Sequence, residues 1–354
     1  MRWTGREAAS KLTINLGQPR IGCAGGEVTR RMKISVVTPL FHTAAHVEEL
    51  HRRCEAAIRT IGAAEHEIVF VNDCSPDESL AEAKGVAARD PNVVVVDLAR
   101  NYGQHKAIMT GLAYATGDYV FVMDSDLEED PEWIPLFHRE LIARHCDVVY
   151  GISSLSRGIA YRIGHRIFYR LIAALSDAPL PRQVCTARLM TRRYVDALML
   201  FTESEVYLAG IWHLTGFAQV PVEVEKRHSS PTTYTLPRLV GLFINAITTY
   251  STRPLLAISI AGIVLSAVAF IYTAWIVAQK LLHGIAIQGW ASVMAVVLLY
   301  GGLSLFFNGV IAIYVAKIFI EVKRRPRTIV REVVGRRRHG GDAAGASDAD
   351  RRSQ

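Results

Sequence analysis

The sequence predicts an α/β fold with a mainly parallel sheet, followed by a hairpin of two apolar helices. Two observations support this prediction. Over residues 32–150, short and almost continuously apolar segments alternate with segments of helical periodicity. Half of the 354 residues are hydrophobic, and the excess is concentrated in residues 254–320. The chain is therefore long enough for one sizeable domain and an accessory region.

Several short segments rich in β-branched residues are predicted to be buried strands. These segments are Lys33–Pro39, Glu67–Asn72, Val93–Leu98, Tyr119–Met123 and Asp147–Gly151, with Val220–Glu225 as a further strand. The predicted helices between them are Val47–Ile61, Ser79–Ala88, Gln104–Ala115 and Pro135–Arg144. Residues 157–200 are predicted to be largely helical and are rich in arginine. Because apolar strands alternate with helices, the sheet should be covered on both faces, and ligands should bind at the carboxyl ends of its strands.

The chain divides into five predicted parts. Residues 1–31 form an extension that lacks the apolar run of a secretory signal and is predicted to be disordered. Residues 32–237 form the globular domain, and residues 238–253 form an amphipathic helix of the interfacial type. Residues 254–320 hold two membrane-spanning helices, and residues 321–354 form a basic, partly disordered tail.

The two apolar stretches are the clearest feature of the second half. Leu255–Gln279 and Trp290–Ala316 contain no charged residue, and each is about 25 residues long, enough to cross a bilayer core. Two buried helices of a soluble protein are the alternative, which the length of the stretches disfavours. Arginine and lysine residues flank the pair, while the connecting turn carries only Lys280. The positive-inside rule then places both ends and the globular domain in the cytoplasm.

Composition excludes some classes of function. The net charge is +7, and much of it follows residue 317, beside apolar segments, which favours anionic lipid over nucleic acid as the partner. The five cysteines show no paired spacing, which indicates reduced cytoplasmic thiols, not a disulfide framework or a zinc site.

The strongest chemical signal is the sequence DSDLE at residues 124–128, directly after a predicted strand. Asp124 and Asp126 can face a single hard cation, and Glu128 could add a third ligand. A departing diphosphate needs Mg²⁺ or Mn²⁺ to neutralise its charge. Acidic turn residues are common, however, so the motif by itself is weak evidence of a metal site.

The surrounding motifs strengthen the signal through a resemblance. The sequences VVTP at 36–39, VNDCSPD at 71–77, NYGQHKA at 101–107, GDY at 117–119 and DPE at 130–132 stand in order around DSDLE. Together they resemble the nucleotide-sugar domain of family 2 glycosyltransferases, which have the GT-A fold. The apolar hairpin, preceded by YTL at 234–236 and STRPL at 251–255, resembles the polyisoprenyl-phosphate branch of that family. The resemblance covers roughly residues 32–325.

The resemblance implies roles for individual residues. Asp124, Asp126 and Glu128 would bind the metal, with Asp126 and Arg188 as catalytic residues. The predicted nucleotide-sugar site consists of Pro39, Phe41, Asp73, Lys106, Asp124 and Ser125, with a charge on a helix surface as the alternative role for Lys106. An Asx turn is the alternative role for Asp73. Cationic residues should hold the lipid phosphate, because guanidinium and ammonium groups match phosphate oxygens. The candidates are Arg162, Arg166, Lys226 and Arg227, although a solvated or lipid-facing helix accounts equally well for the first two.

Two departures from the family pattern replace an acid, while Cys74 stands for a common glycine and Glu128 for a glutamine. Thr43 stands where the family has an acid after the first strand, and Thr186 replaces an aspartate in the CTARL sequence at 185–189. The aspartate is dispensable if the acceptor is a lipid phosphate, which is already ionised at neutral pH and needs no strong general base.

The sequence predicts an enzyme of the inner membrane, and the resemblance implies that it transfers a sugar with inversion, from a nucleotide-sugar such as a UDP-sugar to a polyisoprenyl phosphate such as undecaprenyl phosphate. Mg²⁺ or Mn²⁺ is the expected cofactor, and a homo-oligomer is left open. A processive polysaccharide synthase is one alternative, which the absence of a QxxRW motif disfavours. A catalytically impaired membrane scaffold is the other.

Overall fold

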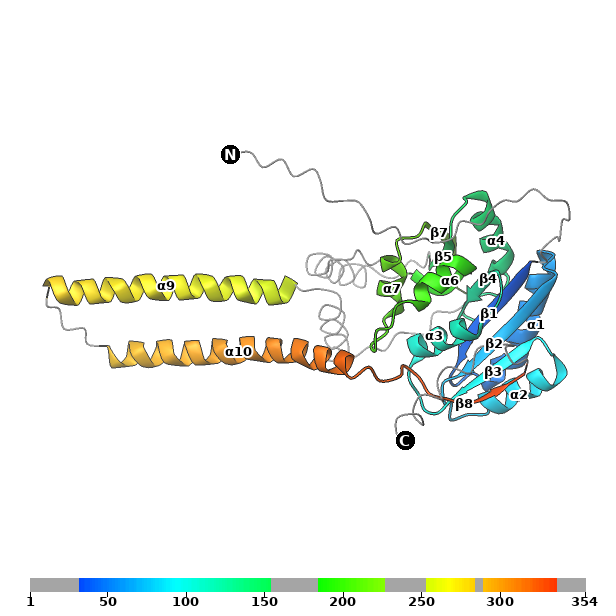
Figure 1. Cartoon of the computed structure of the whole chain (residues 1–354), viewed down its shortest axis with the longest axis horizontal. Coiled ribbons are helices and arrows are strands. Elements are labelled where there is room, and N and C mark those ends of the chain that lie inside the picture. Colours follow the sequence, from blue (N-terminus) through cyan, green and yellow to red (C-terminus); the bar gives the residue numbers. More distant parts are fainter. Residues whose placement is uncertain (1–31, 154–183, 227–252, 284–288, 336–354) are drawn as a thin grey trace, which may run out of the picture. The chain divides into compact units, whose positions relative to one another are not determined.

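The computed structural model describes residues 32–153, 184–226, 253–283 and 289–335. Within them, eight strands form one sheet in the order β7-β5-β6-β4-β1-β2-β3-β8 (Figure 1). The strands are β1 (Lys33–Leu40), β2 (Glu65–Asn72), β3 (Val93–Leu98), β4 (Tyr119–Val122), β5 (Val148–Ser153), β6 (Val184–Thr191), β7 (Gln219–Val224) and β8 (Val330–Val334). The helices of the globular part are α1 (Val47–Thr60), α2 (Ser79–Arg89), α3 (Gln104–Tyr114), α4 (Trp133–Ala143), α6 (Arg192–Met199) and α7 (Leu208–Leu214), with a short 3₁₀ turn, η1, at Ala44–His46.

The centre of the sheet is parallel. Strand β1 pairs in parallel with both β2 and β4, and β2 pairs in parallel with β3. Strand β6 joins β4 and β5 in antiparallel pairing, and β8 closes the other edge antiparallel to β3. The predicted α/β fold with a mainly parallel sheet is thus confirmed, and the predicted strands and helices fall within a few residues of the observed ones.

Helices cover both faces of the sheet because its strands are apolar on both sides. One buried cluster joins α1, α2 and α4 to side chains such as Ile34, Phe70 and Phe121. A second cluster joins α3, α6 and α7 to the opposite face through residues such as Val69 and Val122. Figure 1 shows α3, α6 and α7 on one side of the strands and α1, α2 and α4 on the other. The rigid sheet between the clusters fixes the strand ends that carry the polar loops.

Two strands correct the sequence prediction. Residues 184–191, expected within a largely helical region, form β6, with Cys185, Ala187 and Leu189 in the first cluster and Met190 in the second. In the described part of that region, the following segment, α6, is helical as predicted. Residues 330–334, expected in the basic tail, form β8 and complete the sheet. Both strands add to the sheet through pairing with segments distant in sequence, which local patterns do not reveal.

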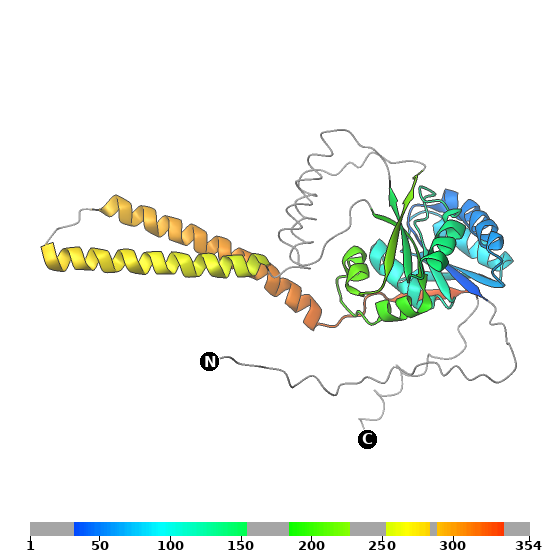
Figure 2. The ribbon, with the colours of Figure 1, turned by 90° about the horizontal axis from the view of Figure 1, so that it is seen from above.

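The apolar hairpin consists of α9 (Arg253–His283) and α10 (Trp290–Val322), each a single unbroken helix in Figures 1 and 2. Arg253–Ile276 and Leu299–Val322 are long and apolar enough to cross a membrane, and the protein buries none of either window. The predicted extension at 1–31 and most of the predicted interfacial helix at 238–253 lie outside the described residues.

Candidate active site

The polar loops meet in a cleft at the carboxyl ends of β1, β2 and β4, as expected for a sheet of this type. The cleft has a volume of about 350 Å³. Its lining residues are Pro39, Phe41, Thr43, Asp73, Asn101, Gly103, Gln104, Asp124, Ser125 and Asp126. Five of the six predicted nucleotide-sugar residues therefore line one cavity. The sixth, Lys106, lies on α3 and is not among the lining residues.

Asp124 is the centre of the polar network in the cleft. Its carboxylate accepts a hydrogen bond from the Gln104 amide and another, of 3.0 Å, from the hydroxyl of Thr186 on β6. Burial, together with the negative charges of Glu129 and Asp126, raises the pKa of Asp124 to about 7. Lys226 and the Thr186 hydroxyl act in the opposite direction. Several acids are therefore gathered with too little positive charge to balance them.

Glu129 is a buried acid that the sequence analysis did not single out. Its side chain is fully buried and accepts hydrogen bonds from the backbone amides of Thr186, at 2.8 Å, and Asp124, at 3.2 Å. Lys226 Nζ lies 3.3 Å from Glu129 Oε1. Burial opposes the charge on Lys226, but the attractions from Glu129, Cys185 and Asp124 together outweigh this effect and raise the pKa of the amine. Glu129 thus joins the DSDLE loop to Thr186 on β6 and to Lys226, which follows β7.

Asp73 shapes the wall of the cleft. Its two carboxylate oxygens accept hydrogen bonds from the backbone amides of Tyr102, at 2.7 Å, and Gly103, at 2.8 Å. Gly103 has a φ of 90°, a conformation that favours glycine. Burial raises the pKa of Asp73, and the two amide bonds partly offset this effect. Asp73 therefore holds the loop between β3 and α3, a long-range role that differs from the Asx turn considered as its alternative.

Two hydroxyl groups connect the loops after β1 and β4. Ser125 Oγ donates a hydrogen bond of 2.7 Å to the carbonyl of Pro39 and lies 3.2 Å from the hydroxyl of Thr43. Ser125 thus contributes to the cleft by joining these loops. Phe41, half-exposed at 44 %, presents an aromatic face at the rim. Such a face can stack on a planar base.

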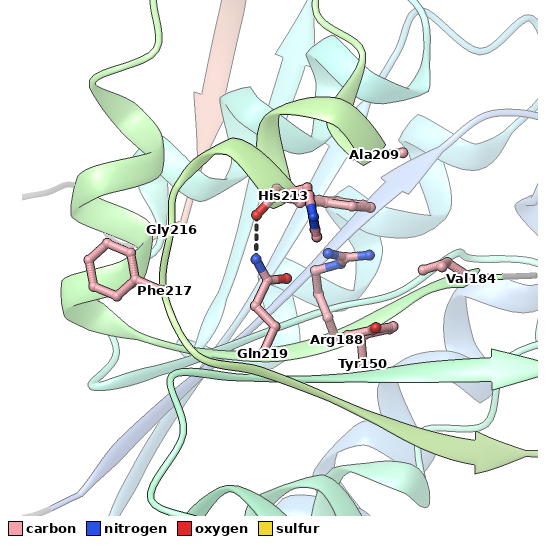
Figure 3. Close-up of a pocket in the computed structure, with 9 residues that line it drawn as sticks. Tyr150, Val184, Arg188, Ala209, His213, Gly216, Phe217 and Gln219 are labelled. Atoms are coloured by element: carbon pink, nitrogen blue, oxygen red, sulfur yellow. Dashed lines mark hydrogen bonds between the residues drawn. The ribbon is translucent and has the colours of Figure 1, made fainter. Parts of the chain in front are cut away.

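Arg188 lies on β6, two residues beyond Thr186, and points to the same face of the strand. Its side chain is only 1 % exposed, and its guanidinium lies over the ring of Trp212. Burial lowers the pKa of Arg188 to about 9. Figure 3 shows Arg188 with Tyr150 and His213 around a second pocket, separate from the cleft lined by Asp124.

Comparison with known proteins identifies the family. Residues 35–199 match the sequence family described as "Glycosyl transferase family 2". A Mycobacterium tuberculosis protein named "Putative glycosyltransferases" is 41% identical over 305 residues, covering 86% of this chain and 89% of that protein. The chain belongs to glycosyl transferase family 2. The family resemblance drawn from the motifs is confirmed, and the chain is a glycosyltransferase.

Two other proteins extend the comparison. The Escherichia coli (strain K12) protein named "Prophage bactoprenol glucosyl transferase homolog" is 32% identical over 305 residues, which cover 85% of this glycosyltransferase and 99% of that protein. Among solved structures, a mannosyltransferase from Pyrobaculum calidifontis, in complex with GDP-Man and Mn²⁺, is 16% identical, with a TM-score of 0.45. That structural match covers 82% of this chain and 86% of the archaeal chain.

The acids of this glycosyltransferase suit a divalent metal. Asp124 and Asp126 both line the cleft and offer only carboxylate oxygens, which are the ligands that Mg²⁺ and Mn²⁺ prefer. A cation there would offset the burial and the neighbouring negative charges that raise the pKa of Asp124. Glu128, the third predicted ligand, is not among the lining residues. Another acidic group, His51 with Glu55 and Asp90, could hold an ion by its spacing, but none of its members lines the cleft.

The predicted lipid-phosphate residues are only partly described. Arg162, Arg166 and Arg227 lie outside the described residues. Lys226 is described, and its closest acidic partner is Glu129. Among residues that the sequence analysis left without a role, the structure adds Gln104, Glu129 and Trp212 to the neighbourhood of the site.

Proposed function

We propose that this glycosyltransferase transfers a sugar from a UDP-sugar to undecaprenyl phosphate or a related polyisoprenyl phosphate, at the cytoplasmic face of the inner membrane. One observation carries the proposal: Asp124 and Asp126 border a cleft that also contains Asp73 and Phe41, in a chain with two helices suited to a bilayer. Relatives named bactoprenol glucosyl transferase, about 30% identical over nearly their whole length, support the lipid acceptor.

The cleft suits a nucleotide-sugar. Phe41 can stack on the base, while Asp73 keeps the Tyr102–Gly103 loop in place beside it. Asp124 and Asp126 are the residues that would hold Mg²⁺ or Mn²⁺. The metal, when bound, would neutralise negative charge on the diphosphate leaving group. Gln104 and Thr186 orient the Asp124 carboxylate from two sides, so this ligand is positioned before a substrate arrives.

The chemistry is a single displacement. An oxygen of the lipid phosphate forms a bond to the anomeric carbon of the sugar, the bond from that carbon to the diphosphate breaks, and the nucleoside diphosphate leaves with the electron pair. The configuration at the anomeric carbon is inverted. The attacking phosphate is already an anion at neutral pH, so no general base is required. Thr43 and Thr186 are therefore compatible with activity, although neither can remove a proton as a carboxylate would.

The test is a transfer assay with the purified full-length protein. Labelled UDP- and GDP-sugars are incubated with undecaprenyl phosphate and Mg²⁺ or Mn²⁺, and the chloroform phase is analysed. We expect one labelled sugar to enter a lipid product, and we expect Asp124→Ala to abolish the reaction. Glu65→Gln, an exposed acid outside the cleft, is the matched control and should keep full activity. Transfer that persists in Asp124→Ala would refute the site, and products with several sugars would indicate a processive synthase.

A further inference from the structure

A second pocket lies between the sheet and helix α7, and we call it the Arg188 pocket. Its volume is about 320 Å³. Figure 3 shows the Arg188 side chain among residues of β5, β6 and α7. The lining residues are Tyr150, Val184, Arg188, Ala209, Trp212, His213, Gly216, Phe217 and Gln219. None of them lines the cleft that contains Asp124, so the pocket is a separate feature of the enzyme.

Arg188 brings a positive charge into this pocket with little to balance it. Its guanidinium donates to the carbonyl oxygens of Thr186, at 3.3 Å, and Cys185, at 3.4 Å, both at the long end of the hydrogen-bond range. Within the part of the chain that the structure describes, no carboxylate forms an ion pair with it. A buried charge is costly unless it is paired, so an arginine held in this way is suited to an anion supplied from outside.

Trp212 adds a hydrogen-bond donor beside Arg188. Its side chain is only 7 % exposed, and the indole Nε1 has no hydrogen-bond partner among the described residues. Buried indole N–H groups usually find an acceptor. The same residue carries the ring against which the Arg188 guanidinium stacks, so the two donors are adjacent. An indole N–H without an acceptor, beside a guanidinium without a carboxylate partner, indicates a ligand with oxygen atoms and a negative charge.

The other lining residues indicate what kind of chemical group is attached to that anion. Val184, Ala209 and Phe217 give the pocket an apolar part, while Tyr150, His213 and Gln219 add polar groups to its lining. The pocket is also connected to the cleft by a single residue. Thr186 accepts the hydrogen bond from Arg188 through its carbonyl and donates one to Asp124 through its hydroxyl. An anion beside Arg188 is thus separated from the acids of the cleft by one residue of β6.

We propose that the Arg188 pocket binds the phosphate of a prenyl phosphate acceptor, with Arg188 and the Trp212 indole N–H as its donors. This inference rests on the proposed function and assigns the acceptor a site distinct from the nucleotide cleft. An uncharged hexose would not need a buried arginine, and the diphosphate of the donor is accounted for by the cleft with its metal-binding acids. The apolar lining suits the first isoprene unit next to the phosphate.

Binding to the purified full-length protein in detergent tests this inference. Farnesyl phosphate, inorganic phosphate and UDP are each titrated by calorimetry into wild-type protein, Arg188→Met and Trp212→Phe. The phenylalanine variant keeps an aromatic ring and removes only the N–H, so it remains informative if Arg188→Met does not fold. Tyr194→Phe is the control, because Tyr194 donates to the Trp212 carbonyl at 3.1 Å but does not line the pocket.

We expect Trp212→Phe to weaken farnesyl phosphate binding about tenfold, and Arg188→Met to weaken it further, since each removes a hydrogen bond to a charged group. UDP affinity should not change, and Tyr194→Phe should bind both ligands as the wild type does. In the transfer assay, the KM for the lipid should rise in Trp212→Phe while the KM for the nucleotide-sugar stays constant.

Unchanged farnesyl phosphate affinity in Trp212→Phe and Arg188→Met would overturn the inference. Inorganic phosphate that binds as tightly as farnesyl phosphate would overturn it too, because the pocket would then select a free anion. Failure of the proposed function would look different. In that case the wild-type protein would form no lipid-linked sugar from any donor, whatever the variants show in the binding experiment.

Discussion

At the scale of single residues, the loop after β4 shows how one position changes the role of a side chain. The sequence pattern favoured Glu128 as a third metal ligand, yet the structure buries its neighbour Glu129 beneath Asp124. Leu127, which precedes these two glutamates, has a φ of 59°. This left-handed conformation turns the backbone, so the order of the residues does not show in which direction each side chain points. Glu129 supports the loop that carries Asp124 and Asp126 by accepting a hydrogen bond from the Asp124 amide. The sequence motif alone does not distinguish this role from metal binding.

The Glu129–Lys226 pair provides a prediction at this scale. Glu129→Gln should lower the stability of the protein by about 3 kcal/mol, because it leaves Lys226 half-buried without its partner. It should also reduce sugar transfer, since the backbone amides of Asp124 and Thr186 lose the carboxylate that accepts their hydrogen bonds. Thermal unfolding by circular dichroism and the transfer assay provide the two measurements.

The double variant Glu129→Gln with Lys226→Met is the control for that prediction. Removing both charges should restore part of the stability lost in Glu129→Gln, because the amine that lost its carboxylate partner is no longer present. Additive losses in the double variant would show that the two side chains do not act as a pair. Activity is expected to stay low in the double variant, since the acceptor for the Asp124 amide is still altered.

At the scale of elements, β6 and β8 were the strands that the sequence did not predict correctly. In β6, polar Thr186 and Arg188 alternate with apolar Cys185 and Leu189, and two arginines follow directly in the sequence. Such a segment is locally compatible with an amphipathic helix. The segment becomes a strand because it pairs with β4 on one side and with β5 on the other. This position puts Thr186 next to Asp124. The strand position therefore decides which residues reach the cleft.

Strand β8 supports a prediction about the edge of the sheet. Gly335 follows β8 with a φ of 103°, and a Cβ at this position would lie 2.2 Å from the carbonyl oxygen of Val93. Gly335→Ala should therefore displace the end of β8 from β3 and cost about 1 kcal/mol or more. A lower Tm in thermal unfolding is the expected result. Gly85→Ala in α2 meets no atom within 4 Å and should leave the Tm unchanged or slightly higher.

Glu67 supports a pH prediction, because it joins β1, β2 and the turn before β4. It accepts hydrogen bonds from Lys33, at 2.8 Å, Ser35, at 2.6 Å, and Thr116, at 2.9 Å. Burial opposes the charge on Glu67, but these partners outweigh that effect and lower its pKa from the ordinary value of 4.5. A lowered folded-state pKa stabilises the protein above the unfolded-state pKa, and the benefit is lost as the pH falls through the folded-state value.

Unfolding temperatures measured from pH 7 to pH 3 test this expectation. The wild type should lose stability below about pH 4.5. Glu67→Gln should be less stable at neutral pH and should show a shallower decline in acid, because it lacks the titrating group. A variant whose decline parallels that of the wild type would contradict the role assigned to Glu67.

At the scale of the whole molecule, the chain combines a polar cleft with two helices whose apolar windows are not buried by the protein. The window Arg253–Ile276 contains 24 residues and has a mean hydropathy of 2.5. A helix of this length extends for about 36 Å, compared with a hydrocarbon core of about 30 Å. Bilayer insertion is therefore the arrangement that would cover this surface.

Membrane association can be tested by placing charge on α9. Leu265→Arg combined with Val268→Arg should oppose insertion by about 6 kcal/mol, since each arginine at the centre of a helix costs about 3 kcal/mol. The expected outcome is release of the protein from membranes by alkaline carbonate, with loss of transfer to undecaprenyl phosphate. Ala56→Arg on the exposed side of α1 is the control and should stay in the membrane fraction. Full retention of the double variant would contradict a spanning role for α9.

The sequence by itself determined the family, the α/β fold, the cleft residues Asp73, Asp124 and Asp126, and the two apolar helices. These features depend on local periodicity, on uncharged length and on motifs that stand together in the chain, so they are readable without coordinates. Only the tertiary structure decided that Glu129 supports Asp124, that β6 brings Thr186 and Arg188 to their positions, and that Trp212 faces Arg188. Each of these contacts joins residues whose proximity or orientation depends on strand pairing, backbone turns and burial, and no local pattern encodes those.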